Sequence, residues 1–77
     1  MVNNLKHYRE KAGLTRPKLA EAIGVDRTLV WRYEKGLSQP SDKIKIRISK
    51  VLKKTVEEIF FSHAVAQETT NTADVNR

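Results

Sequence analysis

Apolar residues recur every three or four positions along the first sixty residues, which is the period of a helix that buries one face. The clearest series are Leu5, Tyr8 and Ala12, then Leu19, Ala20 and Ile23, then Val30 and Tyr33. The pattern predicts amphipathic helices that share one small core.

Residues that start and stop helices separate these series. Short polar residues that can cap a helix precede the later segments: Thr15, Asp26, Ser41 and Thr55. Gly13, Gly24 and Gly36 follow the first three segments, where a left-handed residue is expected, and Pro17 fits only a first turn. These signals predict five helices, at about 3–12, 16–23, 27–34, 42–53 and 56–61, joined by short connections.

The segment "KIKIRIS", residues 43–49, alternates apolar and polar residues as a strand does. A stripe that begins at Ile44 and Ile48 and continues through "KVLKK", with Ser41 as cap, favours a helix instead. On that helix Ile46 lies on the opposite side, where it would make a second buried contact. Because the stripe is needed to close the core, we expect this basic helix to have no membrane partner.

The 77-residue chain carries a net charge of +6, and the positive charge lies in the part predicted to fold. Residues 1–61 contain fourteen Lys and Arg against seven Asp and Glu, whereas residues 62–77 contain one against two. A field of this sign on a folded domain favours a polyanionic partner such as nucleic acid.

Other classes of function are excluded by what the sequence lacks. It has no cysteine, and His7 and His63 have no ligand spacing, so we expect no metal, no cofactor and a reducing, cytoplasmic environment. Without a paired acid and base, a nucleophile beside a histidine or a phosphate-binding glycine loop, we expect no enzyme. No apolar run predicts a signal peptide or membrane span, and the small core leaves no room for a large ligand pocket.

Residues 62–77 are polar and small, and from Gln67 onward the composition predicts disorder. In "FFSHAVAQ", Phe61, His63 and Val65 alternate. This is compatible with a short C-terminal strand that folds back or pairs with a second subunit, and equally with a frayed helix end. The predicted organisation is a folded domain at 1–61 and a dimerisation segment or polar tail at 62–77.

Residues 16–35, "RPKLAEAIGVDRTLVWRYEK", have the spacing of a helix-turn-helix. Ala20 is the small residue at which two steeply crossing helices come closest, and Gly24, four residues later, makes the turn. Apolar residues flank them at fixed offsets: Leu19, Ile23, Val25, Val30 and Tyr33. Each signal is weak alone, but all of them in register on a basic chain predict a DNA-binding unit.

With these motifs the sequence resembles the Cro/phage-repressor-type helix-turn-helix family, also called the xenobiotic-response-element type. The resemblance covers about 4–60 through "NLKHYREKAGLT", "LAEAIGV", "YEKG", "QPS" and "TVEEIF". It implies an all-α, lambda-repressor-like five-helix bundle whose second and third helices bind double-stranded DNA. Small members of the family are bacterial, plasmid or phage transcriptional regulators, commonly dimeric repressors.

The resemblance implies that Arg27, Thr28 and Arg32 face base edges from the third helix. The fork of an arginine suits guanine because it donates to O6 and N7 together, and Thr28 can use its hydroxyl or its methyl. Trp31 stands where the family most often has a small polar residue. It either packs against sugars or a thymine methyl, as a further reader of the bases, or covers part of the core.

Arg16 replaces a glutamine that usually starts the second helix of the family and contacts phosphate. The residues expected to contact phosphates are Arg16, Lys18, Lys35, Ser38, Gln39, Ser41 and Lys43. Such contacts position a protein on DNA without specifying sequence. Arg9 and Glu34 match a family pair that we expect to form a structural salt bridge between the first and third helices.

One helix-turn-helix contacts only a few base pairs, so we expect a homodimer whose recognition helices lie roughly 34–36 Å apart on an inverted-repeat operator. The predicted interface is at the C-terminal end: Ile46, Val56, Phe60, Phe61 and Val65. Part of this end must also close the monomer core.

The sequence therefore predicts a cytoplasmic, nucleoid-associated transcriptional regulator that represses as a dimer. Antitoxins and restriction–modification controllers share this fold, and only genomic neighbours or a toxin partner would separate them. A protein-interaction adaptor could use the same bundle without reading DNA, but Arg27 and Arg32 argue against that alternative.

Overall fold

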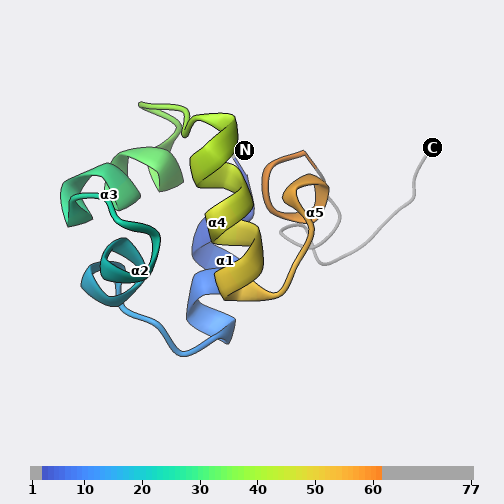
Figure 1. Cartoon of the computed structure of the whole chain (residues 1–77), viewed down its shortest axis with the longest axis horizontal. Helices are drawn as coiled ribbons and strands as arrows, with labels where there is room; N and C mark the ends of the chain where they lie inside the picture. Colours follow the sequence, from blue (N-terminus) through green and yellow to red (C-terminus); the bar gives the residue numbers. More distant parts are fainter. Residues whose placement is uncertain (1–2, 62–77) are drawn as a thin grey trace.

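The computed structural model describes residues 3–61 and shows five α-helices there. They are α1 (Leu5–Lys11), α2 (Arg16–Ile23), α3 (Arg27–Lys35), α4 (Asp42–Leu52) and α5 (Val56–Phe60). In Figure 1, α2 and α3 lie at one end of the long axis, α5 lies at the other, and α1 and α4 lie between them. The predicted all-α bundle is confirmed. The expectations for the tail at 62–77, including the strand and Val65, lie outside the described residues.

The predicted capping residues hold the N-termini of four helices. The side chains of Thr15, Asp26, Ser41 and Thr55 each accept a hydrogen bond from a backbone N–H two or three residues later. Thr55 and Glu58 complete a capping box, since the Glu58 carboxylate accepts from the Thr55 N–H at 2.9 Å. Local interactions therefore define where these helices begin.

The start of α1 is held by two asparagines that the sequence analysis did not single out. The Asn3 side chain accepts from the Leu5 N–H at 2.9 Å and donates to the Tyr33 carbonyl at 3.0 Å. Asn4 is fully buried, and its side chain donates to the Glu58 carbonyl at 2.8 Å. These contacts fasten the first turn of α1 to α3 and α5.

The helices enclose one apolar core. Its buried members are Leu5, Tyr8, Leu19, Ala20, Ile23, Val30, Tyr33, Ile48, Leu52, Ile59 and Phe60. The helix prediction for 43–49 is confirmed: Ile48 is buried and Ile44 half-buried, while Ile46 is 50% exposed on the opposite face. In the isolated chain Ile46 therefore makes no second buried contact.

Candidate nucleic-acid interface

The turn between α2 and α3 closes on the carbonyl of Ala20. This carbonyl accepts from the N–H groups of Gly24 at 2.8 Å and Val25 at 3.0 Å, and Gly24 has a φ of +76°. The Ala20 side chain is buried, as expected for a residue at the contact between α2 and α3. A guanidinium nitrogen of Arg47, from α4, donates to the Ile23 carbonyl at 3.2 Å and braces the turn.

Three predicted base-reading residues gather beside the N-terminus of α2. Arg27 and Thr28 are exposed in the first turn of α3, and Trp31 follows one turn later with 39% of its surface exposed. Together with Arg16 and Pro17 they line an open depression of about 380 Å³. This surface combines two guanidinium groups, a hydroxyl and an indole, and it is the most distinctive feature of the helix-turn-helix.

The first turn of α3 is held in place by Asp26. Its carboxylate accepts from the Thr28 N–H at 2.8 Å. Hydrogen bonds from the backbone and the side chain of Thr28, with a smaller contribution from the charge of Arg27, lower the pKa of the Asp26 carboxyl. The cap stays ionised at neutral pH, where it stabilises the positive end of the helix dipole and orients Thr28.

Arg32 is not among the residues that line the depression. Its Nε donates to the Ser38 hydroxyl at 2.9 Å, and a terminal nitrogen donates to the Leu37 carbonyl at 3.3 Å. The guanidinium of the free protein is therefore engaged with the loop between α3 and α4. From the sequence, Ser38 was expected to contact a phosphate. Its hydrogen bond with Arg32 was not predicted.

The predicted phosphate-contacting residues differ in how they are exposed. Those that lie exposed at the edges of the helix-turn-helix are Lys18, Lys35, Gln39, Ser41 and Lys43. Ser38 is half-buried with Arg32. Arg16 is also half-buried, and its Nε donates to the Glu34 carboxylate at 2.9 Å.

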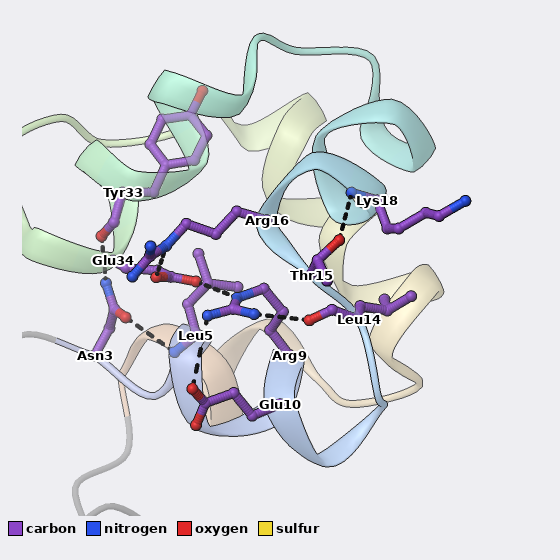
Figure 2. Close-up of polar contacts among 10 residues, drawn as sticks. All are labelled: Asn3, Leu5, Arg9, Glu10, Leu14, Thr15, Arg16, Lys18, Tyr33 and Glu34. Atoms are coloured by element: carbon purple, nitrogen blue, oxygen red, sulfur yellow. Dashed lines mark hydrogen bonds and ion pairs between the residues drawn. The ribbon is translucent and has the colours of Figure 1, made fainter.

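Glu34 is the centre of an ion-pair network that joins three helices (Figure 2). Its side chain is only 2% exposed, and one oxygen accepts from Arg9 Nε at 2.6 Å while the other accepts from Arg16. A terminal nitrogen of Arg9, also buried, donates to the Leu14 carbonyl at 2.7 Å. The sequence predicted a salt bridge between Arg9 and Glu34, and these two side chains are ion-paired here. The ion pair between Arg16 and Glu34 was not predicted.

Glu34 accepts from two guanidinium groups where α1, α2 and α3 meet, and Arg9 also lies 3.8 Å from the exposed carboxylate of Glu10. The Arg9 side chain is almost wholly enclosed, but that of Arg16 is 35% exposed. The Arg16 guanidinium is therefore partly open to solvent, in the depression that Arg27 and Trp31 also line.

The predicted dimer residues that the structure describes lie on α4, on α5 and directly after α5, away from the depression. Ile46 is 50% exposed and Phe61 is 63% exposed, while Val56 is half-buried and Phe60 belongs to the core. The Lys45 ammonium lies 5.2 Å from the centre of the Phe61 ring, a cation–π arrangement. In the described part of the chain, this end thus presents apolar surface that the monomer leaves uncovered.

Residues 3–61, the part that the structure describes, contain neither a cluster of metal-ligating side chains nor a membrane-spanning helix. Within that range no group of three or more His, Cys, Asp and Glu side chains is placed to hold a metal ion. No helix there is long and apolar enough to cross a membrane.

Comparison with known proteins gives a consistent picture. A family model described as helix-turn-helix matches residues 5–59. An uncharacterised HTH-type transcriptional regulator of Methanocaldococcus jannaschii is 40% identical over 60 residues, which is 78% of this chain and 91% of the relative.

Two solved structures share the arrangement of helices. The N-terminal DNA-binding domain of the master biofilm-regulator SinR from Bacillus subtilis aligns with a TM-score of 0.62 and 30% identity, over 71% of this chain and 81% of that one. A complex of SinR and SinI aligns with a TM-score of 0.65 and 31% identity, over 70% of this chain. In that case the match spans about half, 53%, of the other chain.

Proposed function

The chain belongs to the Cro/phage-repressor-type helix-turn-helix family of transcriptional regulators, and we propose that it is a dimeric repressor that reads an inverted-repeat operator. Members of this family regulate transcription by binding DNA, and this function follows from the family. The dimer, the palindrome, the repression and the roles of single residues are the proposal.

The observation that carries the proposal is the open depression at the start of α3. Its lining residues Arg27 and Thr28 are exposed in the first turn of the helix that the family inserts into the major groove. Arg27 donates to O6 and N7 of a guanine, and Thr28 contacts the neighbouring base pair. Arg32 joins them when it exchanges the Ser38 hydroxyl for a base edge.

Phosphate contacts position this helix in the groove. The exposed Lys18, Lys35 and Lys43 provide charge at its edges, and the exposed Gln39 and Ser41, with Ser38, provide uncharged donors. Arg16 contacts a phosphate with its terminal nitrogens while its Nε remains on Glu34, because a guanidinium has donors to spare for both. The ion-pair network thus serves as the fixed support of a phosphate contact.

A second copy of the chain covers the apolar surface of Ile46 and Phe61, with Val56, Phe60 and Val65 completing the interface. The exposure of Ile46 and Phe61 supports this assignment. Two recognition helices about one DNA turn apart then read the two halves of a palindrome.

The test is selection of duplex DNA from a random pool at physiological salt, since lower salt strengthens non-specific binding. The expected result is an inverted repeat whose half-sites lie about one turn apart, and reporter expression from a promoter carrying it should fall when the protein is present. Salt-sensitive binding to every sequence, with nothing enriched, would contradict the proposal and direct the search to a protein partner. A protein in which Arg27 and Thr28 are both alanine is the matched control, and it should lose enrichment while still binding DNA weakly.

A further inference from the structure

Trp31 is a large apolar side chain on the surface that the proposed function places against DNA. It is neither a buried member of the core nor among the partly buried residues packed against it. It lies one turn after Arg27 and three residues after Thr28, so the three side chains occupy one face of α3. The sequence left open whether Trp31 covers the core; in the structure it is 39% exposed, lies outside the core cluster and lines the depression.

The depression is apolar at two of its walls and cationic at two others. Trp31 from α3 and Pro17 from the first turn of α2 provide the apolar walls, and Arg16 and Arg27 provide the guanidinium groups. The wall at Arg16 is held in place by its ion pair with the buried Glu34. The open depression is therefore suited to a small apolar group that lies close to a phosphodiester backbone.

Among the groups that base pairs present in the major groove, only the thymine C5-methyl is both small and apolar. The edges of G, C and A present hydrogen-bond donors and acceptors there, whereas thymine also presents its C5-methyl. Apart from its one N–H donor, an indole presents apolar ring faces, and these faces do not distinguish one polar base edge from another. The apolar ring of Trp31, beside the polar side chains of Arg27 and Thr28, is therefore suited to contact the thymine methyl.

We propose that Trp31 is a specificity-determining residue whose indole packs against the C5-methyl of one thymine in each half-site, in the open depression that Pro17 also lines. This inference rests on the proposed function, because it needs α3 to lie in the major groove. Arg27 and Arg32 read polar base edges by hydrogen bonds. Trp31 selects thymine at a position that no side chain reads in that way.

The test replaces each thymine of the selected operator by uracil, one position at a time, which removes a methyl and leaves base pairing unchanged. Wild-type protein should lose about fourfold in affinity at one thymine of each half-site, the value expected for burial of one methyl-sized group. Trp31→Ala should bind the thymine operator more weakly and be indifferent to uracil at that position. Trp31→Phe should keep part of the sensitivity, which guards against an effect of altered folding.

Leu37→Ala is the matched control, because Leu37 is another exposed apolar residue, in the loop just after α3. It should show the same uracil sensitivity as wild type. Equal sensitivity in wild type and Trp31→Ala, or none at any position, would overturn the role of Trp31 and leave the operator-binding function intact. A selection that enriches no sequence would overturn both, so the two failures are distinct.

Discussion

Arg16, the first residue of α2, donates its Nε hydrogen to the carboxylate of Glu34 near the end of α3, at 2.9 Å. The two helices of the DNA-binding unit are thus joined by an ion pair as well as by the turn that closes on the Ala20 carbonyl. Because Glu34 also accepts from Arg9, the same carboxylate ties the unit to α1. Arg16 stands at the position where the family usually has a phosphate-contacting glutamine, and here it also stabilises the packing of α2 against α3 through Glu34.

Glu34→Gln should lower the free energy of unfolding by about 3–5 kcal/mol, because it removes the buried charge that pairs with the enclosed guanidinium of Arg9. Urea unfolding followed by circular dichroism measures the change. Glu10→Gln is the control, because Glu10 is exposed and lies 3.8 Å from Arg9, so its loss should cost under about 1 kcal/mol. A Glu34→Gln protein that unfolds at the urea concentration of wild type would show that the network contributes nothing.

Arg27→Ala should change base preference at one position of each half-site. An arginine that donates to both O6 and N7 of guanine discriminates by about 1–3 kcal/mol, so the variant should tolerate other bases there and keep its preferences elsewhere. Competition between operators that differ at single positions measures this. Equal weakening on all of these operators would assign Arg27 to phosphate.

Lys35→Ala should weaken binding to every sequence alike, since we propose that this exposed lysine at the end of α3 contacts a phosphate. The slope of log K against log salt should become shallower by about 0.9 for the lost phosphate contact. Lys50→Ala, an exposed lysine of α4 outside the predicted phosphate set, serves as the control and should keep the wild-type slope. A change of preference at one base pair in Lys35→Ala would refute its assignment.

Ile46→Glu and Phe61→Glu should shift the protein from dimer to monomer and weaken operator binding. Both side chains are at least half exposed, so the charge should disturb the interface and not the fold. Sedimentation velocity at tens of micromolar measures the mass, and Leu37→Glu, exposed in the loop after α3, should leave it unchanged. Wild-type protein that sediments as a monomer, with and without operator, would rule out this dimer.

The capping box predicts how stability depends on acid. Hydrogen bonds from Thr55 lower the pKa of the Glu58 carboxyl below its ordinary value of 4.5. A carboxyl whose pKa is lower in the folded state stabilises the fold above the unfolded pKa, and this contribution disappears as the pH falls through the folded pKa. Stability should therefore fall with pH below about 4.5, and Glu58→Gln should show a smaller fall.

Glu57→Gln is the control for that measurement, since Glu57 lies in the same turn but outside the capping box. Melting temperatures across the acid range give the comparison. If Glu58→Gln and Glu57→Gln lose stability in parallel with wild type, the capping box does not account for the acid dependence.

Helix ends were predicted to within two residues because the signals for them are local. A cap such as Thr15 bonds a backbone N–H three residues away, and Gly24 adopts a positive φ whatever its distant neighbours are. Most of the core followed from the same spacing, but Ala12, the last residue of the first predicted series, is exposed just after α1. Lys53, which ends α4 with a φ of 58°, was missed because a lysine gives no signal for that conformation.

The sequence by itself thus determined the five helices, the helix-turn-helix and the excess of positive charge on the folded domain. Only the tertiary structure decided which partners the long side chains take. Arg16 reaches a carboxylate eighteen residues along the chain, Arg32 turns to Ser38, and Trp31 stays outside the core. A long side chain has many rotamers of similar energy, and it is the arrangement of packed helices that selects among them.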